Sequence, residues 1–176
     1  MRFIGVFVIL LALSGCYHVE DKESNTKLKQ LYTSFIQELY NGEYKLTKYI
    51  TRKGITDTLY IDSVNWPQEL KLFTELNISK SYLSDYHCIT SKNGCEKIFQ
   101  TNFNKYPIKR YKYLHCDNNF IVAIDFEKSS LLYSFCYHLE LNQNGYLIEI
   151  ISDVKMAYES NYRIEGKFIT NEDKTD

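Results

Sequence analysis

The chain has 176 residues, of which 44% are hydrophobic, 24% charged and 15% aromatic. This length suits one domain with a substantial hydrophobic core, and the apolar content excludes a wholly disordered chain. The formal net charge is -1 at pH 7. A nucleic-acid-binding role is therefore not expected, because phosphate contacts require a basic surplus.

The first fifteen residues have the pattern of a secretory signal peptide. Arg2 precedes an apolar run over 3–13, and the small residues 14–15 precede Cys16. A basic start, a short apolar stretch and small residues before a cleavage point are typical of such a signal. The run is shorter than the roughly 20 residues that a membrane-spanning helix needs.

The segment Leu13-Ser14-Gly15-Cys16 resembles the lipobox of bacterial lipoproteins. The resemblance implies that the Cys16 sulfur receives a diacylglyceryl group, that the chain is cut before Cys16, and that the new amino terminus is acylated. Each buried methylene contributes on the order of 0.8 kcal/mol, so about two or three acyl chains would hold the protein to the bilayer. We expect a lipid-anchored protein of the bacterial cell envelope, with the outer membrane as its expected location. A plain signal peptide with a chance cysteine is the alternative.

The mature chain begins with a polar segment and continues as one domain. Residues 16–26 show no apolar period and are expected to form a flexible tether, which leaves 27–176 as a single domain. Apolar residues recur at helical spacing over 28–40 and predict a helix that ends at Asn41-Gly42. One further helical turn is expected around 46–50.

A second helix is predicted to start near Asn65. The Asn65 side chain can cap the helix, Pro67 suits its first turn, and Gln68 can return a hydrogen bond to the cap. Leu70 and Phe73 would then lie on its buried face.

The apolar period changes to two in the second half of the chain, which predicts strands joined by hairpins. A turn at Asn118-Asn119 would place Lys112 opposite Asp125 and Arg110 opposite Glu127, with apolar residues on the other face.

Two later turns would extend this sheet. A turn at Lys128-Ser129 would continue the apolar face, and Asn144-Gly145 is a strong hairpin signal. The last long strand would carry the inward residues Ile148, Ile150, Val154, Met156 and Tyr158. The predicted class is α+β, with N-terminal helices packed on one face of an antiparallel β-meander sheet.

Four cysteines follow Cys16, an even number that favours disulfides in an exported chain. Cys88 and Cys95 bracket a predicted turn, so we expect a disulfide between them. The predicted registers put Cys116 and Cys136 about 9.6 Å apart, whereas a disulfide tolerates roughly 7 Å between Cα atoms. Either these two thiols are free or the predicted register is wrong.

Histidines accompany cysteines at His87-Cys88, His115-Cys116 and Cys136-Tyr137-His138. Neighbouring residues on a strand point to opposite faces, so only Cys136 and His138 share a face. Zinc needs three or four convergent ligands, and we therefore expect no metal site and no cofactor. Because no glycine-rich elbow surrounds a cysteine and no phosphate-binding loop occurs, the sequence assigns no catalytic residue.

The sixteen tyrosines have two interpretations. Tyr111, Tyr113, Tyr133 and Tyr137 fall on the predicted inner face, where they would line an apolar ligand cleft with a few convergent hydroxyls. The alternative is an ordinary β-rich core in a protein whose composition favours tyrosine.

Several short segments carry a further resemblance, and they are Asp62–Leu70 with Phe73, Asn77–Lys80, Leu132–Ser134, Gly145–Ile148 and Tyr162–Lys167. Spread over 27–168, they resemble a family of uncharacterised lipoproteins of the Bacteroidota. The resemblance implies an envelope location and a non-catalytic role, and it carries over no catalytic residue because that family has no established activity. The cysteines after Cys16 are not part of the pattern, which leaves their role open.

Three hypotheses follow. The leading one is a non-catalytic domain, anchored to the lipid bilayer through acylated Cys16, that binds an unknown protein or small molecule. The second is an immunity-type or inhibitor lipoprotein that masks a toxin or hydrolase. The third is a small hydrolase or thiol enzyme, which would rely on His138, Cys136 or His115.

Overall fold

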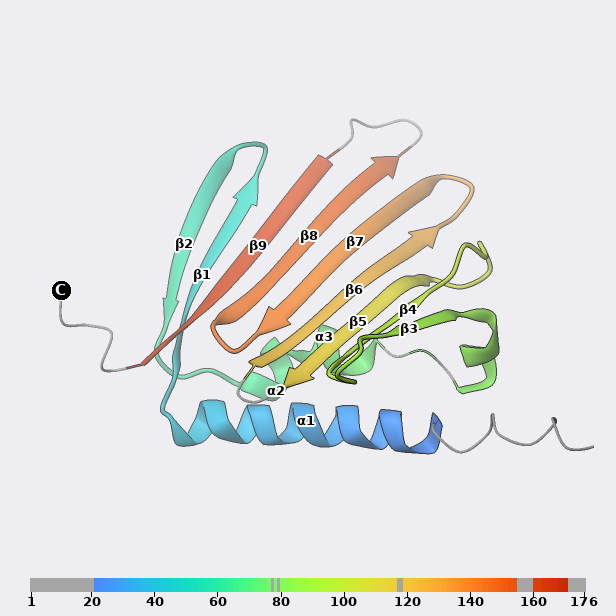
Figure 1. Ribbon diagram of the computed structural model, residues 1–176. Coiled ribbons are helices and arrows are strands. Elements are labelled where there is room, and N and C mark those ends of the chain that lie inside the picture. The colour runs from blue at the N-terminus through green and yellow to red at the C-terminus, as the bar shows by residue number, and fades with distance from the viewer. Residues whose placement is uncertain (1–20, 77, 79, 117–118, 155–159, 171–176) are drawn as a thin grey trace, which may run out of the picture.

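The computed structural model describes residues 21–76, 78, 80–116, 119–154 and 160–170. Figure 1 shows a large twisted sheet with helices near one end of it. The elements are α1 (Asp21–Asn41), β1 (Lys45–Arg52), β2 (Ile55–Ile61), α2 (Trp66–Glu69), α3 (Lys71–Glu75), the 3₁₀ helix η1 (Lys80–Asp85), β3 (His87–Thr90), β4 (Glu96–Gln100), β5 (Ile108–Cys116), β6 (Asn119–Ser129), β7 (Tyr133–Asn142), β8 (Gly145–Val154) and β9 (Ser160–Ile169). The predicted signal peptide, Cys16, Met156 and Tyr158 lie outside the described residues.

The nine described strands form one antiparallel sheet with the order β2-β1-β9-β8-β7-β6-β5-β4-β3. Among the described residues, strands make up most of the regular secondary structure. The predicted α+β class, with helices packed on one face of a meander, is therefore wrong, and the fold is β-rich. Helix α1 has 21 residues, whereas α2 and α3 have four and five. The helices gather at one end of the sheet, and the N-terminal third contributes two strands that the prediction did not contain (Figure 1).

The β1–β2 hairpin occupies the segment where a helical turn was expected. Lys53 and Gly54 have φ angles of 50° and 78°, the positive values that a two-residue type I′ turn needs. The flanking strands are rich in threonine, tyrosine and isoleucine, which favour extended backbone. β1 then pairs with β9 over Lys45–Arg52, so this N-terminal hairpin extends the sheet beyond its C-terminal strand.

Helix α1 crosses the end of the sheet where β6 begins. Tyr32 and Phe35 pack against Phe120 at the start of β6, with ring centroids 6.1 and 5.1 Å apart, and Leu39 is fully buried. These residues are the apolar stripe that predicted the helix.

The bounds of α1 agree with the prediction at one end only. The helix ends at Asn41, as predicted, but it begins at Asp21. Residues 21–26, expected to belong to the flexible tether, are therefore helical.

The second predicted helix begins where expected but is divided into α2 and α3. The Asn65 side chain accepts a hydrogen bond from the Gln68 backbone N–H at 3.3 Å, and Pro67 occupies the first turn. Trp66, Leu70 and Phe73 are buried in the core.

The strand registers differ from the predicted ones by even numbers of residues. In the β5–β6 pair, Arg110 lies opposite Asp125 rather than Glu127, and Lys112 lies opposite Ala123. Since side chains alternate with a period of two, an even shift keeps every side chain on its predicted face. The inner face was therefore predicted correctly while the partners were not.

The next two hairpins show the same pattern. Ile124 faces Leu139 across β6 and β7 instead of Tyr133, and the β7–β8 turn lies at Gln143-Asn144, one residue before the predicted site. Ile148 lies opposite Leu139 on the inner face. The predicted last strand is divided, because β8 ends at Val154 and a further strand, β9, follows.

The core lies where the helices meet the inner face of the sheet, the face that α1 contacts. Trp66 packs edge-on against Phe168 of β9, with ring centroids 5.2 Å apart. The largest fully buried side chains are Trp66, Phe73, Leu39, Leu46, Leu70, Ile124, Leu139, Leu141 and Val122.

Candidate functional site

The four tyrosines predicted to line a cleft share the inner face but are spread along it. Tyr111 pairs with Ile124 and Tyr113 with Val122, both fully buried residues of β6. Tyr137 lies opposite Phe126, and Tyr133 lies at the start of β7, near the far end of the sheet. These hydroxyls do not surround one point.

Tyr111 and Tyr32 form a buried pair between β5 and α1. The two hydroxyls are buried and interact with each other, and among the described residues neither has another hydrogen-bond partner. Burial raises the pKa of both tyrosines well above the ordinary value, so both stay neutral. This pair is therefore part of the packing between α1 and the sheet.

Exposed and partly buried apolar side chains lie together at the opposite end of the same face. We call this set the open-end surface, and its residues are Phe126, Leu131, Leu132, Tyr133, Phe135 and Tyr137. Leu131 is 85% exposed, Leu132 68% and Tyr133 36%. In Figure 1 the β6–β7 hairpin that carries these residues extends away from the helices.

The rings of the open-end surface form a continuous series. Phe126 and Tyr137 face each other across β6 and β7 with centroids 5.3 Å apart. Phe135 lies 6.3 Å from Tyr137 and 5.3 Å from Tyr133. These spacings are typical of favourable aromatic pairs, so the rings hold one another in place without a helix above them.

The tip of this hairpin is fixed by Ser130. Its hydroxyl oxygen accepts hydrogen bonds from the backbone N–H groups of Leu132 and Tyr133, both at 3.3 Å. The Ser130 N–H donates to the Tyr133 carbonyl at 2.7 Å. The tip leucines are therefore exposed on an ordered turn.

The outer face of the sheet has the opposite character. The registers align Arg110, Asp125, His138, Glu149 and Arg163 in one row across five strands. His138 Nδ1 lies 2.6 Å from Asp125 Oδ1, the Arg110 guanidinium lies 3.8 Å from the other Asp125 oxygen, and Arg163 pairs with Glu149. Charges of both signs are matched along the row, as expected of a solvated surface.

The cysteine and histidine candidates lie on β5 and β7. Cys136 is free and exposed and lies opposite Glu127, while His138 pairs with Asp125. Within the described ranges, no three His, Cys, Asp or Glu side chains are grouped to hold a metal ion. His115 is exposed on β5 next to Cys116.

The disulfide joins Cys95 to Cys116, with Cα atoms 5.4 Å apart. The predicted Cys88–Cys95 pairing is wrong, because Cys88 lies opposite Phe99 on the edge strand β3 and is free. The His115 backbone N–H donates to the Cys95 carbonyl at 3.0 Å, which brings the start of β4 against the end of β5. The predicted register for Cys116 also fails, since this residue faces Asn119.

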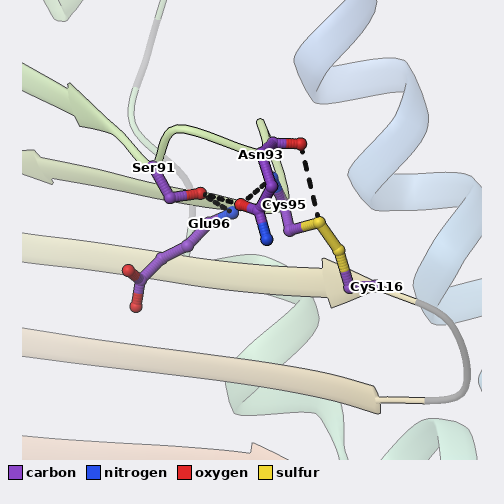
Figure 2. Close-up of a disulfide and its surroundings, with 5 residues drawn as sticks. All are labelled: Ser91, Asn93, Cys95, Glu96 and Cys116. Carbon is purple, nitrogen blue, oxygen red and sulfur yellow. Dashed lines mark hydrogen bonds between the residues drawn. A yellow bond between two sulfur atoms is a disulfide. The ribbon is translucent and has the colours of Figure 1, made fainter.

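Figure 2 shows how the Ser91–Glu96 turn holds Cys95. The Asn93 side-chain oxygen accepts hydrogen bonds from the Ser91 hydroxyl at 2.6 Å and from the Cys95 N–H at 3.2 Å. The Glu96 N–H donates to the Ser91 hydroxyl at 3.0 Å. The turn therefore positions the cysteine independently of its disulfide partner.

Two clusters that the sequence analysis missed combine an acid, a lysine and a tyrosine. Near the helices, Lys48 Nζ lies 2.6 Å from Glu69 Oε1, and Tyr146 donates a hydrogen bond to the same oxygen. Both charged side chains are only 18% exposed. Burial, followed by the bond to Glu69, raises the pKa of Tyr146. This cluster ties α2 to β1 and β8.

The second cluster lies beside the β4–β5 connection. Asp85 accepts hydrogen bonds from Tyr106 and from Lys105, the latter at 3.0 Å. The Tyr106 hydroxyl, followed by the Lys105 ammonium, lowers the pKa of Asp85. No short-range sequence signal marks either cluster, because their members come from separate elements.

None of the described helices has both the length and the apolar character needed to cross a bilayer. No protein-family model, curated protein or solved structure matches the chain.

Proposed function

We propose that this chain is a lipid-anchored protein of the bacterial envelope whose domain binds a partner protein, without catalysis, through the open-end surface. The exposure of Leu131 and Leu132 beside a series of partly buried rings carries this proposal. Contiguous exposed apolar surface on an ordered element is a common mark of a protein–protein contact.

The choice of a protein partner rests on the shape and chemistry of the open-end surface. The apolar side chains extend from the inner face onto the tip of the hairpin, and aromatic residues are enriched at the centres of protein interfaces. The side chains that define the open-end surface carry no charge, and the polar residues next to them on the same face are Lys128 and Ser152, which lie on either side of Phe135. A partner would therefore be recognised through burial of apolar side chains.

The proposed export is supported by the Cys95–Cys116 disulfide. Such bonds persist in oxidising compartments and are rare in the cytosol. Cys16 precedes the start of α1 at Asp21 by five positions, and five residues span at most about 17 Å. An acylated Cys16 would therefore hold the domain close to the bilayer.

Intact mass measurement on protein extracted from membranes tests the anchor. The expected mass corresponds to a chain that starts at Cys16 and carries acyl groups. Alkylation before reduction should modify two thiols, Cys88 and Cys136, and alkylation after reduction should modify two more. A chain without lipid would contradict the proposed anchor.

Site-specific photo-crosslinking in intact cells tests the binding surface. A photoreactive residue replaces Leu132, and the control replaces Ile151, an exposed apolar residue on the outer face. We expect a discrete protein adduct from position 132 that is absent from position 151 and weakened by Phe135→Ala. No adduct, the same adducts at both positions, or a lipid-sized adduct would each contradict a protein partner at this surface.

A further inference from the structure

Strand β2 is an exposed edge with little of the usual protection against pairing. In the part of the chain that the structure describes, it pairs only with β1. Its seven residues form an uninterrupted register with β1, and Ile55, Leu59 and Tyr60 are 71%, 47% and 79% exposed. Natural proteins block such edges with charged residues, especially lysine, with proline, with bulges or with short strands, and of these β2 has only one charged residue, Asp57.

The other edge of the sheet shows the contrast. Strand β3 has four residues, His87–Thr90, and a short edge offers few hydrogen bonds to a newcomer. The two edges therefore differ in their capacity to accept another strand, and β2 can form more hydrogen bonds with it than β3 can.

The turn geometry determines which backbone groups of β2 are free. In a two-residue hairpin the residues that flank the turn, here Arg52 and Ile55, form a hydrogen-bonded pair, and such pairs alternate along the strands. The backbone N–H and C=O groups of Thr56, Thr58 and Tyr60 therefore point away from β1.

We propose that β2 pairs antiparallel with β2 of a second copy of this chain, about a two-fold axis through Thr58. This register places Thr58 opposite its own copy and Thr56 opposite Tyr60 of the second copy. It uses all three outward-pointing residues in both copies, whereas a shift of the axis by one residue leaves one of them without a partner. The arrangement is isologous, as a two-fold dimer requires.

Charge favours the same register. Asp57 carries the only charge within Ile55–Ile61, and an axis through Asp57 would set two like charges opposite each other, which is destabilising. With the axis through Thr58, each Asp57 lies opposite Leu59, and Ile55 lies opposite Ile61. The axis at Thr58 therefore combines the most hydrogen bonds with no direct charge repulsion.

Cysteine cross-linking of the full-length chain tests this register. The variants are made in a Cys88→Ser, Cys136→Ser background, which removes the free exposed thiols of the described residues, and the same background without a new cysteine controls for Cys16. Thr58→Cys should give a covalent dimer with a short thiol-specific cross-linker, because facing residues in an antiparallel pair lie about 5.5 Å apart. Thr56→Cys is the matched control, since its two copies would lie more than about 13 Å apart along the strand.

A mixed experiment sharpens the assignment. The Thr56→Cys chain and the Tyr60→Cys chain should each give no cross-linked dimer alone. When the two chains are mixed, they should cross-link to each other. Equal cross-linking at 56 and 58 would indicate random collision and overturn the proposal, as would the absence of a Thr58→Cys dimer.

A proline variant provides a second measurement. Thr58→Pro removes an N–H that points away from β1, so the hairpin should still form, as proline is tolerated at such edge positions. Light scattering should give a dimer for the unmodified chain and a monomer for Thr58→Pro, with unchanged circular dichroism. A monomeric unmodified chain, or a variant that folds and remains dimeric, would refute the pairing.

Discussion

The two ends of the inner face differ although the same strands form both. Near the helices, Ile124 and Leu139 are fully buried, whereas at the open end the same two strands lead to Leu131 and Leu132, which are largely exposed. On β7 the inner face stays apolar from Leu141 to Tyr133, whereas Lys128 on β6 and Ser152 on β8 interrupt it at the open end. Alternation therefore specifies a face, and the helices decide how much of that face becomes core.

Substitutions of leucine on one hairpin should separate the two ends most clearly. Leu139→Ala leaves a cavity in the core and should lower the free energy of unfolding by about 2–5 kcal/mol. Leu131→Ala at the exposed tip should change it by less than about 0.5 kcal/mol. Urea denaturation of both variants measures the difference, and equal losses would show that the open end is part of the folding core.

The disulfide should stabilise the end of the sheet that the helices cover. Replacing both Cys95 and Cys116 by alanine releases a loop with a sequence separation of 21 residues, and the expected loss is about 3 kcal/mol. Replacing the free Cys88 and Cys136 instead should have little effect. Thermal unfolding of the two double variants checks this, and a larger loss from the second pair would contradict the observed pairing.

Removing a charge from the acid–lysine–tyrosine cluster near the helices should lower the free energy of unfolding more than removing a charge from an exposed ion pair. Glu69→Gln disrupts a largely buried contact with Lys48 and Tyr146, with an expected cost of about 1–3 kcal/mol. The control is Glu149→Gln, which removes an exposed pair with Arg163 and should cost less than about 1 kcal/mol. Chemical denaturation of both variants at neutral pH makes the comparison.

The second cluster should contribute a small dependence of stability on pH. The pKa of Asp85 is lower in the folded protein than its ordinary value, which is about 3.9 in an unfolded chain. Its contribution is therefore present above that pH and lost as the pH falls through the lower, folded value. Asp85→Asn should reduce the fall in melting temperature below about pH 4. An unchanged pH profile would show that the Tyr106 and Lys105 contacts do not stabilise the fold.

Local sequence features predicted the elements better than their partners. The stripe including Tyr32, Phe35 and Leu39 predicted α1 because helical periodicity is contained within one segment. The cap at Asn65 likewise predicted the start of α2 from adjacent residues. Strand faces were also predicted, since they require only a period of two.

Registers and cross-links depend on information that local patterns lack. The charges of Arg110 and Lys112 can be matched in more than one register, and in the structure Lys112 pairs with Glu96 of β4 at 2.7 Å. The Cys95–Cys116 contact depends on the register between β4 and β5. Residues 101–107 separate these two strands, so no tight turn determines that register. The β1–β2 hairpin was missed because residues 46, 49 and 50 also fit helical spacing.

The candidate site was predicted only in part. Tyr133 and Tyr137 belong to the open-end surface, but Tyr111 and Tyr113 lie towards the helices. The exposure of Leu131 and Leu132 had no sequence signal, because leucine is ordinarily expected in a core. Only the positions of the helices reveal which inward residues remain uncovered.

The pairing of β1 with β9 sets the order in which the sheet can be completed. Arg52 pairs with Tyr162 and Lys45 with Ile169, so these contacts join residues far apart in the chain. Contacts of long range form slowly, because a large loop must close first. The β1–β2 hairpin must therefore wait for the last strand to be synthesised before it can join the sheet. Until then the unpaired edges of this hairpin can pair with other chains, so aggregation is most favoured during this interval.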